Sequence, residues 1–308
     1  MSVDLPYVAV RGAERGKTLW INGQVHGDEI NGMIASLRFA RALDAKKLRG
    51  NVVVTPTANP HALDARRKRN PYDELDLDQT FPGSGRGLIS ERLSHALFAQ
   101  IREVADMLVS LHTMNPLFDS KLYCVYKVHP DSGVSEQDQL KALSVFNPNV
   151  ACRQNVTGAG ELPGNIAGGI DYQALATRIP AFMVELGGGS RYESHNVEAA
   201  VLGFRRLAAQ LGILPALEGD EAPASVRRVT KRNWVTFEKG GLFTPEIEAG
   251  ATVEAGTVIG RTTNLFGEQI ESFEAEVPSV VFGLRRDPVV HTGERAAFVA
   301  TEWDSVRV

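Results

Sequence analysis

The sequence predicts an α/β domain followed by a small all-β barrel or sandwich domain, and three observations support this fold class. Short apolar runs alternate with longer stretches of helical periodicity through the first two thirds of the chain. Continuous apolar runs of this length are typical of strands buried on both faces of a sheet between helices. After about Arg227 the helical stretches stop, and short strand-like runs are separated by glycine-containing turns.

The predicted strands of the α/β part are apolar or alternating runs bounded by polar or turn residues: 7–10, 19–21, 51–55, 106–111, 120–128 and 179–185. The predicted helices have apolar residues at helical spacing or are rich in helix formers: 30–42, 88–104, 135–146, 171–176 and 193–211. Residues 59–87 keep neither period and are predicted to form a long polar loop, which in compact domains often has a function. Residues 147–169 are also predicted to be a loop.

A composition change divides the chain. Residues 214–224 contain Pro215, Gly219 and Pro223 among acidic residues, as in a linker. We therefore expect one domain over residues 1–220 and a small β-domain over residues 225–308. The glycine- and valine-rich repeats of the second part resemble the barrel-sandwich of biotinyl and lipoyl carriers. No lysine follows Lys239 to carry such a cofactor, which excludes a carrier function. Resemblance to other proteins implies that this domain caps a functional site of the first domain or mediates oligomerisation.

Bulk composition excludes several classes of function. The 308 residues carry 33 basic and 37 acidic side chains, a net charge of −4 that gives no electrostatic footprint for nucleic acid or an anionic membrane. No apolar run approaches the ~20 residues that span a bilayer, and the start lacks signal-peptide features. The cysteines, Cys124 and Cys152, lack metal-type spacing. We therefore expect a cytoplasmic protein with reduced cysteines.

Candidate metal ligands lie where predicted strands end. His26 and Glu29 follow the strand at 19–21, His112 follows the strand at 106–111, and Glu185 ends the strand at 179–185. Alone, a His-x-x-Glu pair is common by chance and more often marks a surface pair. In open α/β sheets, however, ligands gather beyond the carboxyl ends of strands. Two imidazoles and one carboxylate form a catalytic zinc set, and a further carboxylate, Glu185, suits a general base that is not a ligand.

These residues carry a resemblance to the zinc carboxypeptidase-like deacylases, and within them to the succinylglutamate desuccinylase/aspartoacylase family. Four segments resemble motifs of that family, in the same order along the chain: Gln24-Val-His-Gly-Asp-Glu29; Asn59-Pro60 with the following arginines and Asp76-Leu-Asp-Gln-Thr-Phe-Pro-Gly83; Ser110-Leu-His112-Thr; and Val184-Glu185-Leu-Gly187. The resemblance spans about Trp20 to Leu211. It implies a zinc-carboxypeptidase-like mixed sheet flanked by helices.

The resemblance also implies the chemistry. It implies one Zn²⁺ per chain with three protein ligands: His26, Glu29 and His112. It implies that Glu185 activates a water that hydrolyses the amide bond of a small N-acyl compound. An arginine should polarise the carbonyl and stabilise the oxyanion; Arg69 is our first choice for this role and Arg67 our second.

Two positions depart from the family pattern. Asp78-Gln79 stands where the family has Asn-Arg, and that arginine normally binds a substrate carboxylate with its planar guanidinium. We therefore expect Asp78 and Gln79 to face a neutral or cationic leaving group. Equally, Asp78 can pair with a neighbouring arginine (Arg66, Arg67 or Arg69) and never meet the substrate. Ser110 replaces an aspartate, which predicts a different affinity for metal.

Two alternative functions remain at this point. One is a zinc carboxypeptidase that acts on peptides through the same metal site, against which the loss of the Asn-Arg pair counts. The other is a non-catalytic, metal-dependent binding protein. The expected partner is a small-molecule N-acyl substrate, without nucleic acid or membrane, and homo-oligomerisation is left open.

Overall fold

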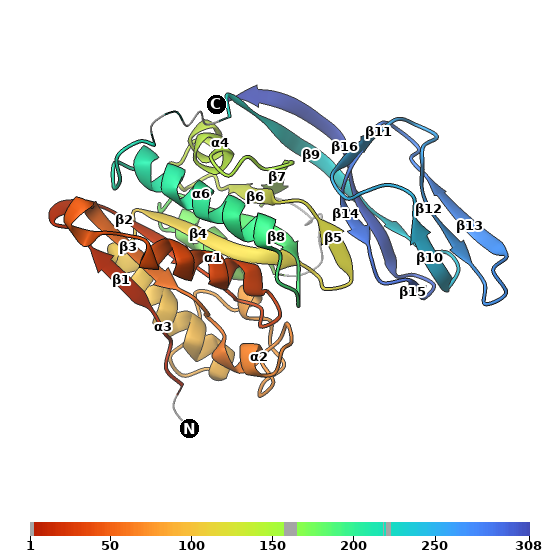
Figure 1. Ribbon diagram of the computed structural model, residues 1–308. Helices are drawn as coiled ribbons and strands as arrows, with labels where there is room; N and C mark the ends of the chain where they lie inside the picture. The colour runs from red at the N-terminus through yellow and green to blue at the C-terminus, as the bar shows by residue number, and fades with distance from the viewer. Residues whose placement is uncertain (1–2, 157–164, 218, 220–222) are drawn as a thin grey trace.

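A mixed sheet of twelve strands runs through the computed structural model, which describes residues 3–156, 165–217, 219 and 223–308 (Figure 1). Eleven strands follow the order β1-β3-β2-β4-β8-β6-β7-β9-β16-β14-β11, and β5 pairs with β14. Their bounds are β1 Val8–Arg11, β2 Glu14–Asn22, β3 Arg49–Thr55, β4 Met107–Met114, β5 Phe118–Ser120, β6 Tyr123–Val128, β7 Ala151–Asn155, β8 Ala181–Gly188, β9 Ser225–Thr236, β11 Ala251–Val253, β14 Ser279–Arg285 and β16 Arg295–Arg307.

Four parallel strands, β3, β2, β4 and β8, form the centre of the α/β part. β4 is buried at all eight positions, as expected for a strand covered on both faces. β1 and β6 pair antiparallel to this group, on β3 and β8 respectively, so the sheet is mixed, as the family resemblance implies.

Helices cover both faces of this sheet (Figure 1). α1, α4 and α6 share one hydrophobic core with the sheet, whereas α3 and α5 share the other. The described part of the chain contains six α-helices, with bounds α1 Ile30–Arg41, α2 Pro60–Asp64, α3 Ile89–Val104, α4 Glu136–Ser144, α5 Ile170–Ala176 and α6 Ser194–Gln210. Three-residue 3₁₀ turns lie at Ala45–Lys47, Leu77–Gln79 and Ile166–Gly168.

The C-terminal part is all-β, as predicted. A separate antiparallel sheet has the order β13-β12-β10-β15, with bounds β10 Gly241–Pro245, β12 Val258–Thr263, β13 Gln269–Glu274 and β15 Val289–Val290. Its buried aromatic residues Phe243 and Phe273 pack with Val281 and Ala297 of the large sheet, which makes a sandwich. The large sheet continues across the predicted domain boundary because β9 pairs with β7. Residues 218 and 220–222 of the predicted linker lie outside the described residues.

The structure corrects several element assignments. Residues 151–155 of the predicted loop form β7, a short strand whose polar residues hid its period but which pairs on both sides with β6 and β9. The predicted loop at 59–87 contains α2 and a 3₁₀ turn, each started by a side-chain cap from Asn59 and Asp76. The predicted strand at 120–128 is split between β5 and β6. Residues 157–164 lie outside the described part.

His112 lies within β4 and not after the strand, and Glu185 lies within β8 and not at its end, because both strands run further than their apolar runs. The two residues are register partners in adjacent parallel strands. Within the described residues, no helix combines the length and apolar character needed to cross a membrane.

A substitution at Phe204 of α6 tests the packing of the hydrophobic core that α1, α4 and α6 share with the sheet. Its ring is fully buried and contacts the rings of Phe39 and Phe146, with centroids 5.6 and 5.5 Å away. Phe204→Ala should lower the free energy of unfolding by about 3–5 kcal/mol, measured by chemical denaturation. Leu202→Ala, on the exposed side of the same helix, should change the free energy of unfolding by no more than about 0.5 kcal/mol. Equal losses in the two variants would contradict the burial described.

Candidate metal and active site

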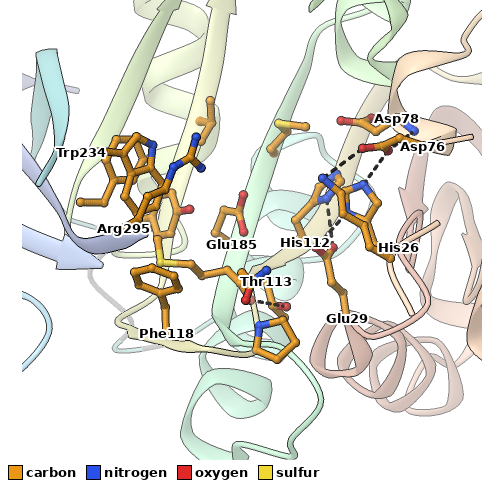
Figure 2. A pocket seen from close by; sticks show the side chains of 18 of the residues that line it. His26, Glu29, Asp76, Asp78, His112, Thr113, Phe118, Glu185, Trp234 and Arg295 are labelled. Carbon is orange, nitrogen blue, oxygen red and sulfur yellow. Dashed lines mark hydrogen bonds and ion pairs between the residues drawn. The ribbon is translucent and has the colours of Figure 1, made fainter. Parts of the chain in front are cut away.

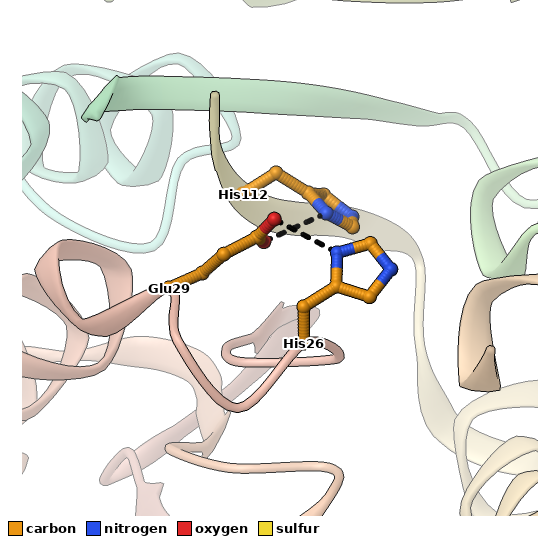
Figure 3. Close-up of side chains that lie close together, drawn as sticks. All are labelled: His26, Glu29 and His112. Atoms are coloured by element: carbon orange, nitrogen blue, oxygen red, sulfur yellow. Dashed lines mark hydrogen bonds and ion pairs between the residues drawn. The ribbon is translucent and has the colours of Figure 1, made fainter. Parts of the chain in front are cut away.

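Three buried side chains meet at the edge of the parallel strands (Figure 3). His26 lies in the turn after β2, Glu29 is the residue before α1, and His112 lies on β4. Oε1 of Glu29 is 2.8 Å from Nδ1 of His26, and Oε2 is 3.1 Å from Nδ1 of His112. One ligand atom from each residue lies within 4.8 Å of the others. The predicted ligand set is thus brought together.

Gly27 allows the turn that carries two of these residues. A Cβ built on Gly27 would lie 2.0 Å from the backbone carbonyl of Ala62, so any other residue would push α2 away. The N–H of Gly27 donates to the carbonyl of Arg67 at 3.1 Å. The turn after β2 is therefore fixed against the loop that follows β3.

Outer partners orient both imidazoles. Nε2 of His26 is 2.9 Å from Oδ1 of Asp76, and Nε2 of His112 is 3.0 Å from Oγ of Ser110. Each histidine therefore presents Nδ1 to Glu29 while its other nitrogen is held from outside. Ligand histidines in metal sites are held in this way. The buried set of two imidazoles and one carboxylate fits a single divalent metal ion.

The three side chains of the cluster shift one another's pKa values. Although burial acts in the opposite direction, the neighbouring imidazoles lower the pKa of Glu29 to about 2. The same contacts, against the effect of burial, raise the pKa of both His26 and His112 above the usual value. Although burial acts in the opposite direction, the hydrogen bonds and positive charges of His26 and Lys68 hold the pKa of Asp76 well below its usual value. A metal ion that binds Nδ1 must displace protons, so its affinity rises with pH.

Glu185 lies beside the cluster without belonging to it. Its place opposite His112 follows from the register of β4 and β8. Its Oε2 atom is buried and has no hydrogen-bond partner among the described residues. Burial raises the pKa of Glu185 to about 7. A carboxylate with such a pKa, facing a cavity, is suited to accept and return a proton near neutral pH.

The cluster and Glu185 line one cavity of about 660 Å³. Figure 2 shows that its two ends differ: Asp76, Asp78 and the cluster lie at one end, and aromatic and arginine side chains at the other. The second end is lined by residues of β9 and β16, among them Trp234 and Arg295. The C-terminal part therefore contributes directly to the cavity wall.

Of the four predicted site residues in the loop between β3 and α3, two line the cavity and two do not. Asp78 and Gln79 line the cavity. Asp78 is half-buried, and its buried Oδ1 atom has no hydrogen-bond partner among the described residues; it makes no ion pair there with a neighbouring arginine. Arg67 pairs with Glu74, and Arg69 is exposed; neither lines the cavity.

The cation from this loop that lines the cavity is Lys68, whose Nζ is 3.0 Å from Oδ2 of Asp76. Sequence reasoning assigned no role to Lys68 or Asp76, although both lie in motifs that it singled out. It also missed a buried ion pair in the cavity wall, in which Nζ of Lys127 lies 2.5 Å from Oδ2 of Asp171. No sequence signal links Lys127 and Asp171, which are 44 residues apart.

Comparisons with known proteins agree with this geometry. Residues 15–211 match the family model described as the succinylglutamate desuccinylase/aspartoacylase catalytic domain. An N-alpha-acetyl-L-2,4-diaminobutyric acid deacetylase of Halomonas elongata is 24% identical, over 99% of this chain and 88% of the relative.

Solved structures share the fold. A succinylglutamate desuccinylase of Silicibacter sp. TM1040 superposes with a TM-score of 0.84 at 21% identity, covering 97% of this chain and 89% of that one. The product-bound ectoine utilization protein EutE (DoeB) of Ruegeria pomeroyi gives a TM-score of 0.83 at 23% identity, covering 97% and 90%. The family model spans most of the chain and includes every residue of the metal cluster. The chain therefore belongs to the succinylglutamate desuccinylase/aspartoacylase family and is a deacylase of N-acyl compounds with a buried His-Glu-His metal site.

Proposed function

We propose that this deacylase uses one Zn²⁺, that Glu185 is its general base, and that its substrate presents a neutral or cationic amine portion to Asp78 and Gln79. The observation that carries this proposal is the unpartnered, buried Oε2 of Glu185 in the same cavity as the metal cluster. Zinc is supported by the donor set, because two histidines and one carboxylate are common catalytic zinc ligands.

The bound cation would be held by His26, Glu29 and His112. When bound, such an ion acts as a Lewis acid, which polarises a carbonyl oxygen and makes water more acidic. Glu185 takes the proton from the attacking water and carries it to the nitrogen of the breaking amide bond. The raised pKa of Glu185 favours both halves of this transfer near neutral pH. Asp76 and Ser110 keep the two imidazoles in place during the reaction.

A positively charged group should also stabilise the developing oxyanion. Arg69 is the arginine that the sequence predicts for this role, with Arg67 next. Lys68 is a further candidate that we add, because it lines the cavity and lies close to the cluster through Asp76.

The position of Asp78 favours a substrate whose amine portion carries no negative charge next to this side chain. A carboxylate placed beside the buried, unpartnered oxygen of Asp78 would meet electrostatic repulsion, whereas an ammonium group would gain a charge-assisted hydrogen bond. The relative from Halomonas elongata is named for a diamino acid, which has a second amino group. We therefore propose N-acyl diamino compounds as the first substrates to test.

Metal binding and turnover should separate in two variants. His112→Ala removes a ligand and should lose stoichiometric zinc, measured by elemental analysis of the purified protein, as should His26→Ala. Glu185→Gln should keep zinc at the level of the unmodified protein and lose turnover by a factor of at least about 100. A fully active Glu185→Gln protein would show that another group is the base.

The pH dependence of kcat/KM should show an acidic limb from Glu185. The carboxyl group must be deprotonated to act as a base, so activity rises with pH through its pKa. Burial raises that pKa to about 7 without the cation, and a bound cation lowers it, so the midpoint should lie at or below 7. An acidic limb centred above pH 8 would be inconsistent with this assignment.

Asp78→Asn should change selectivity more than rate. It removes the charge while keeping a similar shape, so the preference for an N-acetyl diamino acid over the analogue without the second amino group should fall roughly tenfold. The measurement compares kcat/KM for the two compounds in both proteins. An unchanged preference would mean that Asp78 does not contact the amine portion.

A further inference from the structure

Two side chains of β9 present unused hydrogen-bond donors to the wall of the cavity. Arg232 is only 7% exposed, and its Nε and Nη2 atoms have no hydrogen-bond partner within the described residues. Nε1 of Trp234 is likewise buried without a partner there. Both residues line the cavity that holds the metal cluster and Glu185.

The local structure fixes these donors in place. Residues two apart on a strand point to the same face, so Arg232 and Trp234 lie side by side on β9. The indole of Trp234 stacks on the ring of Phe298, its partner on β16, with centroids 4.1 Å apart and planes at 3°. The guanidinium carbon of Arg232 is 5.5 Å from the centre of the same ring. Such a preorganised arrangement costs a ligand little ordering entropy.

Arg232 has no carboxylate partner among the described residues, unlike the buried Arg285 and the half-buried Arg191. Arg285 is 4% exposed and is paired with Glu294 at 3.2 Å. Arg191 is paired with Asp119 and Glu193. Among the described residues, Arg232 makes no ion pair within 4.0 Å. A buried charge without a partner is unfavourable, so the cavity should be completed by an anion.

A carboxylate is the anion that this site fits best. The planar guanidinium donates two parallel N–H bonds to a carboxylate, and the indole N–H adds a third donor. The other end of the cavity, with Glu29, Asp76 and Asp78, would repel a carboxylate (Figure 2). The two ends therefore impose one orientation on a ligand that carries both signs of charge.

We infer that Arg232 and Trp234 form the binding site for a carboxylate group of the substrate. The orientation of that substrate rests on the proposed function, in which the amide bond lies between Glu185 and the metal cluster. The carboxylate belongs either to the amine portion, as in an N-acetyl diamino acid, or to the acyl portion, as in an N-succinyl amine. Arg232 is a specificity-determining residue and takes no part in bond cleavage.

Matched acid and carboxamide pairs test this inference in two arms. The first arm uses N-acetyl-2,4-diaminobutyrate and its carboxamide; the second uses N-succinyl-butylamine and its terminal carboxamide. Each compound is titrated calorimetrically into zinc-loaded protein with Glu185→Gln, and kcat/KM is measured with Glu185 present. In one arm the acid should bind at least about tenfold more tightly than its carboxamide. Adding Arg232→Gln should abolish that difference and leave carboxamide binding unchanged.

Three further variants separate charge recognition from folding. Arg232→Lys keeps the charge and should retain part of the preference for the acid. Trp234→Phe keeps the stacked ring but removes the N–H, and should weaken acid binding by about 2- to 10-fold. Lys231→Gln removes a positive charge from the same strand at a residue that pairs with Glu302 outside the cavity, and should leave the preference intact.

Two results would overturn the inference: equal binding of acid and carboxamide in both arms, or an Arg232→Gln protein that weakens acid and carboxamide by the same factor. Preferential binding of an acid through Arg232 without hydrolysis in either arm would support the carboxylate site and refute the proposed function.

Discussion

The carboxylate of Glu29 between two buried imidazoles is the interaction on which the site depends. A buried carboxylate needs partners, and the two Nδ1 atoms at 2.8 and 3.1 Å supply them. His26 and His112 are distant in sequence but meet because β2 and β4 are adjacent parallel strands, with Asn22 opposite Ser110. The same register places Glu185 of β8 beside His112, so the carboxyl ends of these strands position both the cluster and Glu185.

Because the large sheet is continuous, the two oppositely charged ends of the cavity are held by one sheet. β9 pairs with β7 on one side and β16 on the other, so the wall that carries Arg232 belongs to the same sheet as Glu185. The acidic end and the arginine end are thereby held at fixed positions on either side of Glu185 (Figure 2). A substrate with separated charges would be oriented before any bond is broken, which is a large part of what binding energy contributes to catalysis.

Sequence reasoning predicted the features that depend on local pattern. The buried runs of β3, β4 and β8 have a clear signal, and the metal ligands follow them or lie on them, so both the α/β core and the cluster could be predicted. β7 could not, because its burial comes from pairing on both sides and not from an apolar run. The choice among Arg67, Lys68 and Arg69 depends on how an irregular loop turns, which no periodicity describes. Arg232 escaped notice because its burial without a counter-ion is a property of the assembled cavity.

A requirement for one metal ion, held by His26, Glu29 and His112, is what we expect above all of the deacylation reaction. Its most direct test is a titration of chelator-treated protein with Zn²⁺ in which bound metal and hydrolysis of an N-acetyl diamino acid are followed together. Activity should rise in proportion to bound metal and stop rising at one ion per chain. Full activity in the chelator-treated protein, or activity that continues to rise beyond one ion per chain, would contradict it.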